Sequence, residues 1–128
     1  MDYVYYVGKA SLVIRLIQHL QNCWDSPIQF MTVLHQLNGW VVRIKPRDWP
    51  LEKQINFQSF MNELGVSHTP NRRVNQVLHA LEQGETPVEV MNRHQVAVII
   101  HGVPSVDEIE VFRKQFIEGL GYCPETLA

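Results

Sequence analysis

Hydrophobic and aromatic residues in the first third of the chain gather into short runs separated by one helical pattern. Residues 3–7 form a β-branched and aromatic run, which is typical of a strand. Apolar residues between positions 10 and 23 recur at helical spacing and predict a helix. Residues 28–35 and 40–44 are again rich in β-prone side chains, with Asn38-Gly39 between them. The pattern predicts a strand, a helix and a β-hairpin.

Residues 28–35 have a second interpretation. Pro27 suits the first turn of a helix, so the same segment is also compatible with a short helix. We favour the strand, because an Asn-Gly pair between two β-prone runs is the strongest local signal for a tight hairpin.

The rest of the chain is punctuated by glycine and proline. An amphipathic helix is predicted over Leu51–Leu64 and ends at Gly65. A capping box beginning at Ser105 predicts a last helix that runs to about residue 119. The remaining predictions are a helix over residues 71–83, a second pair of strands at 86–91 and 96–100, and an extended tail over 122–128.

These elements together predict an α+β domain with a mostly antiparallel sheet and four covering helices. The first part of the chain, residues 3–68, is also compatible with a ferredoxin-like βαββαβ order.

The two halves of the chain, residues 1–66 and 67–121, show a similar order of residue types. Residues 26–31 match residues 86–91 in character at every position, and Phe60 to Gly65 resembles Phe116 to Gly121. One interpretation is an internal duplication of an αββα unit around a pseudo-two-fold axis. The other is chance, because two units of similar length share apolar positions anyway.

Composition narrows the function classes. The chain has 128 residues, of which 45% are hydrophobic and 19% charged, and its formal net charge is -2. These values predict one compact domain and do not favour a protein that coats nucleic acid. No apolar run approaches the roughly 18 residues of a membrane span. Cys23 and Cys123 form no metal-binding motif, so we expect reduced thiols in the cytoplasm.

The sharpest local pattern is Tyr5-Tyr6-Val7-Gly8-Lys9-Ala10, followed by Arg15 and His19 on the predicted helix. Over about 17 residues this segment resembles the second half of the GIY-YIG nuclease signature. The resemblance implies phosphodiester hydrolysis, with Tyr6, Arg15 and His19 as the catalytic residues.

The same segment has a broader interpretation as an anion site. A strand followed by Gly8, Lys9 and Ser11 at a helix N-terminus aims backbone N–H groups and an ammonium toward a phosphate or carboxylate. Arg15 lies one turn further along the same helix. A sensor of a small anionic ligand is therefore a second alternative, and a solvated Lys9 beside an ordinary helix cap is the simpler interpretation.

Other chemistry is not indicated. The six histidines lack metal-ligand spacing, and neither cysteine has an evident base nearby. Residues 72–94 suggest a helix-turn-helix, but the second element carries only Arg93 as a DNA-facing cation. Large aromatic residues at the ends of elements are typical of binding surfaces: Trp24, Trp40, Trp49 and Tyr122.

We therefore expect a non-enzymatic regulatory or adaptor protein that acts through protein–protein contacts. Its partner is expected to be another protein, a second copy in a homodimer, or both, with no cofactor and no metal.

Overall fold

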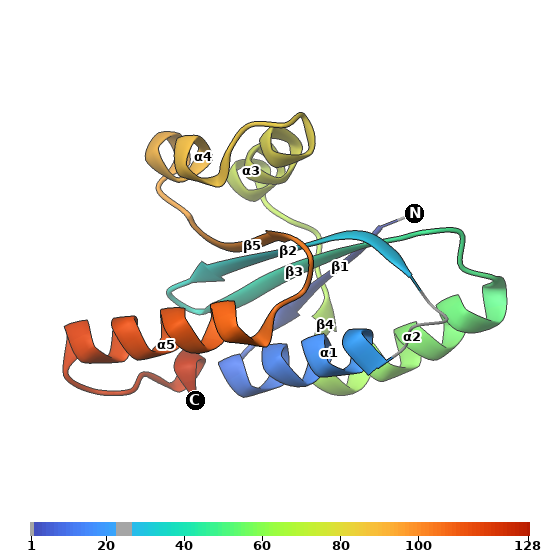
Figure 1. The fold of residues 1–128 in the computed structure, drawn as a ribbon, viewed down its shortest axis with the longest axis horizontal. Helices are drawn as coiled ribbons and strands as arrows, with labels where there is room; N and C mark the ends of the chain where they lie inside the picture. The colour runs from blue at the N-terminus through green and yellow to red at the C-terminus, as the bar shows by residue number, and fades with distance from the viewer. Residues whose placement is uncertain (1, 23–26) are drawn as a thin grey trace.

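The computed structural model describes residues 2–22 and 27–128 (Figure 1). The chain contains five strands and five α-helices in the described residues, and it ends in a short 3₁₀ turn. In order, the elements are β1 (Tyr3–Val7), α1 (Ala10–Asn22), β2 (Ile28–Gln36), β3 (Gly39–Pro46), α2 (Leu51–Leu64), β4 (Val66–Ser67), α3 (Arg72–Glu82), α4 (Pro87–His94), β5 (Ala97–Gly102), α5 (Val106–Leu120) and η1 (Glu125–Leu127).

The strands form one sheet in the order β4-β1-β3-β2-β5, and every neighbouring pair is antiparallel. The α+β expectation is confirmed. The first six elements have the β-α-β-β-α-β order, with strands arranged 4-1-3-2, so the ferredoxin-like interpretation of this part is also confirmed. β5 extends that four-stranded unit along the outer side of β2.

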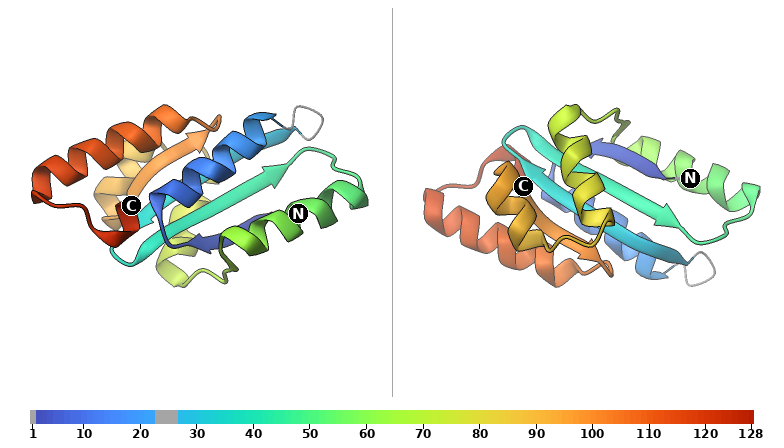
Figure 2. Two further views of the ribbon diagram at one scale, coloured as in Figure 1. Left: turned by 90° about the horizontal axis from the view of Figure 1, so that it is seen from below. Right: turned by 90° about the horizontal axis from the view of Figure 1, so that it is seen from above.

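Helices cover both faces of the sheet, which we call the lower and upper faces as drawn in Figure 1. Helices α1, α2 and α5 cover the lower face, while α3 and α4 lie on the upper face (Figures 1 and 2). The described residues form five α-helices, one more than the four expected, because the additional helix α4 replaces a predicted strand. None of these helices has both the length and the apolar character needed to cross a membrane.

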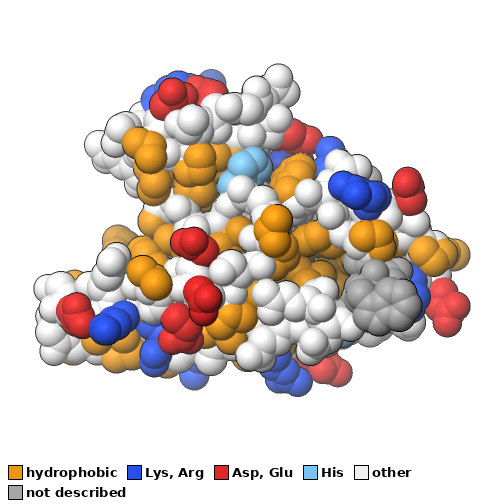
Figure 3. All heavy atoms as spheres, in the orientation of Figure 1, with side chains coloured by type: hydrophobic (Ala, Val, Ile, Leu, Met, Phe, Trp, Pro, Cys, Tyr) orange, Lys and Arg blue, Asp and Glu red, His pale blue; other side chains and the backbone are white. Residues whose placement is uncertain are grey.

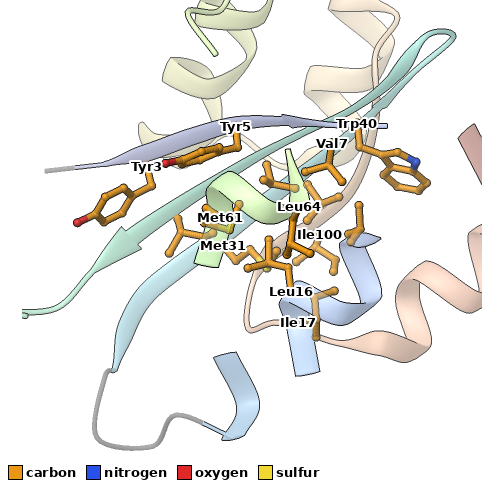
Figure 4. Packing of buried hydrophobic residues seen from close by; sticks show 14 of the residues in the cluster. Tyr3, Tyr5, Val7, Leu16, Ile17, Met31, Trp40, Met61, Leu64 and Ile100 are labelled. Atoms are coloured by element: carbon orange, nitrogen blue, oxygen red, sulfur yellow. The ribbon is translucent and has the colours of Figure 1, made fainter. Parts of the chain in front are cut away.

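The larger core lies between the sheet and its lower helices (Figure 4). Alternation along β1 sends Tyr3, Tyr5 and Val7 to this side, where they meet the fully buried Leu16 of α1 and Met31 of β2. Each such side chain contributes roughly 1.5–3 kcal/mol by leaving water. The smaller core joins the upper face to α3 and α4 through Leu34, Val41, Val74, Val77, Leu81 and Val90.

The predicted hairpin is confirmed, and residues 28–35 form a strand. Leu37 and Asn38 connect β2 to β3, and Gly39, the first residue of β3, has a φ of 154°, which favours glycine. The ring of Tyr6 packs where a Cβ of Gly39 would lie, and its hydroxyl donates to the Asn38 carbonyl. The turn is therefore fixed by the Tyr6 side chain of β1.

The prediction of a strand at residues 86–91 is wrong, because these residues begin α4. The Thr86 side chain accepts a hydrogen bond from the Glu89 N–H, and Pro87 occupies the first turn. Val90 is buried against the upper core on one side of this helix. Capping favours the helix, and the burial of Val90 decides for it against the β-propensity of the valines.

The second half of the chain has the order α3-α4-β5-α5, whereas residues 10–64 have the order α-β-β-α. The sequence segments that resemble each other at residues 27–31 and 87–91 adopt a strand in one half and a helix in the other; residue 26 lies outside the described residues. The expected second αββα unit is thus absent, and these element orders do not support the pseudo-two-fold axis.

The tail is not extended as expected. Residues 125–127 form η1, and Leu127 is fully buried between the lower helices. Three successive carbonyls of the tail accept hydrogen bonds: Thr126 from Trp40 Nε1 at 2.7 Å, Leu127 from Arg113 Nε at 2.5 Å, and Ala128 from the Ser11 N–H at 3.1 Å. Through Leu127 and these three carbonyls, the end of the tail is fixed to the body of the protein.

Candidate binding surface

The residues of the nuclease-like segment are divided between the two faces of the sheet. Tyr6 lies on the upper face, because its neighbours Tyr5 and Val7 point into the lower core. Arg15 is exposed on α1, which covers the lower face, and His19 stacks on Phe60 with ring centroids 3.8 Å apart. The structure therefore does not bring Tyr6 together with Arg15 and His19 in one site.

The start of α1 was the second sequence-based candidate. Gly8 is partly exposed, and Lys9 and Ser11 are exposed. However, the Ser11 N–H already donates to the Ala128 carbonyl, and the next two N–H groups bond to the Lys9 carbonyl. The backbone N–H groups expected to bind an anion thus form hydrogen bonds within the chain. Arg15 remains exposed one turn later.

The large aromatic residues at the ends of elements were expected on the surface, but two of the tryptophans are buried. Trp40 and Trp49 are buried, and their Nε1 atoms donate to the carbonyls of Thr126 and Pro27. Tyr122 is exposed, and Trp24 lies outside the described residues. The two tryptophans therefore belong to the core, which corrects their interpretation as surface anchors.

A cluster of charged residues on the upper face was not predicted. Arg43 of β3 is only 9% exposed, and its guanidinium bonds to Asp2 and to Glu82 of α3. Lys45 Nζ lies 2.9 Å from the other Glu82 oxygen. Hydrogen bonds from Lys45 and Arg43 lower the pKa of Glu82 to about 2. The cluster ties the C-terminal end of α3 to the sheet.

Thr32 and His101, next to this charged cluster, also help to attach α3 to the sheet. Thr32 Oγ1 lies 2.8 Å from His101 Nδ1, and His101 also bonds to the backbone of Leu81 at the end of α3. Burial lowers the pKa of His101. A hydroxyl beside an imidazole has the composition of a nucleophile and its base. Thr32 is only 1% exposed, however, so a substrate cannot reach it and the pair is structural.

His35 lies at the opposite end of the sheet, inside an aromatic cage. Its ring is 7% exposed and lies 4.7 to 5.3 Å, centroid to centroid, from the rings of Trp40, Phe112 and Phe116. Its Nε2 atom lies 3.5 Å from the Thr126 hydroxyl oxygen. Burial lowers the pKa of His35, so the ring stays neutral near pH 7. The cage links the hairpin to α5 and the tail.

Above this cage a hollow of about 420 Å³ opens at the β2–β3 turn. We call it the hairpin-end hollow. His35 and Phe116 contribute to its floor, and Leu37 projects from its rim with 93% of its surface exposed. Four amide side chains and one guanidinium complete the polar part of its lining: Gln36, Asn38, Asn71, Gln95 and Arg73. The arrangement offers hydrogen-bond donors and acceptors beside one exposed apolar side chain.

Among the described residues, no group of three histidine, cysteine or carboxylate side chains is close enough to hold a metal ion. No family model matches the chain, and no curated protein or solved structure matches it either. Any function must therefore be inferred from the chain's own surfaces.

The hollow combines residues from four distant segments, so only part of it could be predicted from the sequence. The Asn38-Gly39 pair marked the hairpin in the sequence, but no pattern singled out Leu37. The contributions of Arg73 and Gln95 depend on where α3 and α4 fold back over the sheet, which no local pattern encodes.

Proposed function

We propose that the protein is a non-enzymatic adaptor or regulatory protein, and that it binds a segment of another protein at the hairpin-end hollow. The observation that carries the proposal is Leu37, which is 93% exposed on a fixed turn. An exposed apolar side chain on a fixed turn loses little backbone entropy on binding and gains by leaving water.

The polar lining supports an extended polypeptide as the bound species. The amide side chains of Gln36, Asn38 and Gln95 offer both N–H donors and carbonyl acceptors, as a peptide backbone does. The Asn71 carbonyl accepts from the Val74 N–H, so Asn71 offers its N–H donors. Arg73 is the one side chain of fixed charge among the residues that line the hollow, and it favours a partner segment that carries a carboxylate.

The surroundings of the titratable groups favour binding over catalysis. His35 is enclosed by aromatic rings, and Thr32 is buried beside a half-buried His101. Tyr6, Arg15 and His19 are divided between the two faces of the sheet. None of these three groups of residues forms an accessible pair of nucleophile and base.

The proposal is tested with a displayed library of random peptides selected on the wild-type protein. Selected peptides are then measured by calorimetry against L37S and R73A, with L51S as the matched control. Leu51 is likewise an exposed leucine, on α2. We expect about tenfold weaker binding to L37S and to R73A, and unchanged binding to L51S. Peptides that bind all four proteins equally, or a selection that yields no binder, would contradict the proposal.

A further inference from the structure

β5 forms an unusually open edge of the sheet. Its six residues, Ala97–Gly102, contain no Lys, Arg, Asp, Glu or Pro, the residues that commonly protect an edge strand. A bulge at Ile99, which has no partner on β2, is the one irregularity in the pairing of β5 with β2. β2 pairs with one side of β5, and within the described parts of the chain no backbone hydrogen bond reaches its other side. The edge is therefore a template for another strand.

Two helices flank this edge. Both α4 and α5 contact β5, and Figure 1 shows α4 above the strand and α5 below it. Figure 3 shows the cleft between the two helical layers, with hydrophobic side chains on its walls and acidic side chains on the lower rim. If another protein added a strand to β5, the helices beside that strand would come into contact with α5.

The position of α5 along β5 can be derived from two points. Residues 103–105 join the end of β5 to the start of α5, and Phe116 lines the same hollow as Ala97 at the start of β5. Six strand residues span about 17 Å, and residues 106 to 116 of a helix span about 15 Å. α5 thus runs back along β5, and Val111 lies beside the middle of the strand.

This arrangement makes the outer side of α5 complementary to itself. Val111 is 53% exposed, and Glu108 and Lys114 lie three residues before and after it, both exposed. Neither charge forms an ion pair within the described residues. A two-fold axis through the middle of β5 places Val111 against Val111 of a second copy. It also places each Glu108 opposite the other copy's Lys114.

We propose that a second copy of this chain docks on the β5 edge, with the two β5 strands antiparallel and the two sheets joined into one. The two α5 helices then pack antiparallel beneath the joined strands. Val111 lies at the centre of that contact, with one Glu108–Lys114 pair on each side. A dimer of this kind satisfies the open backbone groups of β5 and covers exposed apolar surface in one step.

The proposal is tested by sedimentation equilibrium of the full chain over a wide range of concentration. Wild type is expected to dimerise. E108K and K114E are each expected to weaken the dimer by about tenfold or more, because each turns two attractive contacts into repulsive ones. The double variant E108K/K114E restores opposite charges and is expected to recover most of the wild-type affinity. V111D places two carboxylates on the axis and is expected to give a monomer.

E63K is the matched control, because Glu63 is exposed on α2 and away from β5, and its dimer is expected to match wild type. Circular dichroism of each variant establishes that it is folded. Two outcomes would overturn the proposal: a wild-type protein that remains monomeric, and a dimer that E108K, K114E and V111D leave unchanged. Both concern β5 and α5, so they leave the peptide measurement at the hairpin-end hollow as a separate test.

Discussion

The β4 edge and the β5 edge of the sheet differ in length, in packing and in their neighbouring segments. β4 has two residues, pairs with Tyr5 and Tyr6, and is succeeded by His68, whose N–H donates to the Val4 carbonyl at 3.0 Å. β5 has six residues, no strand beside its outer side, and two flanking helices. The β4 edge is thus too short to pair with a further strand. The β5 edge is longer, carries no Lys, Arg, Asp or Glu, and has unpaired backbone groups within the described residues.

This difference separates a region that stabilises the fold from a region that leaves surface for contacts. Around β4 the backbone is packed so closely that a side chain at Gly65 would meet the Tyr6 carbonyl oxygen. Around β5 the chain keeps an apolar strand and exposed valines on both neighbouring helices. Changes near β4 should therefore mainly affect folding, and changes near β5 should mainly affect association.

The largest expected effect is at the β4 edge. G65V places a branched side chain against the Tyr6 backbone, which cannot move without disturbing the β1–β3 pairing. We expect a loss of about 3 kcal/mol in the free energy of unfolding, measured by urea denaturation. G119A is the matched control, because nothing lies within 4 Å of a Cβ there, and it should gain about 0.5 kcal/mol. Equal stability of the two variants would contradict the packing at β4.

A smaller effect is expected where α3 is attached to the sheet. R43M leaves Asp2 and Glu82 without their shared partner and should cost about 2 kcal/mol. The matched substitution K45M removes a more exposed cation and should cost no more than about 0.5 kcal/mol. Urea denaturation measures both variants. A loss from K45M as large as that from R43M would show that burial of Arg43 is not what matters.

A still smaller effect is a dependence of the free energy of unfolding on pH, which comes from His35 near the β5 edge. Because burial lowers the pKa of His35 below its usual 6.5, the unfolded chain binds a proton more readily than the folded protein does. Stability is therefore full above about pH 6.5 and declines as the pH falls below it. We expect H35Q to flatten this decline in urea denaturations between pH 7 and 5. An unchanged slope in H35Q would assign the decline to other groups, such as His101.

Much of the fold could be predicted from the sequence, because its signals are local. Asn38-Gly39 marks the hairpin, and the β-α-β-β-α-β order follows from regular apolar spacing up to residue 68. The second half was harder, because Val88 and Val90 favour a strand by propensity while Thr86 and Pro87 cap a helix. That conflict is decided by the packing of Val90 against the sheet, which is a tertiary contact.

The candidate surfaces were less predictable than the fold. The segment from Tyr6 to His19 has the most distinctive residues in sequence, yet a strand sends Tyr6 to one face and the following helix covers the other. In contrast, Leu37, Glu108 and Val111 belong to no sequence motif. They become candidates for binding only because the fold places them on exposed surfaces. Whether an edge strand is open, and which helix lies beside it, depends on strand order, which the sequence does not state directly.

Hydrogen exchange at the β5 amides tests the difference between the two edges most directly. In wild type at high concentration, we expect the β5 amides to be protected as strongly as those of the central strand β3. In V111D, the amides of β5 that do not bond to β2 should exchange rapidly, while those of β3 stay protected. Equal exchange at β5 in the two proteins would contradict the account, because the open edge would then have no partner.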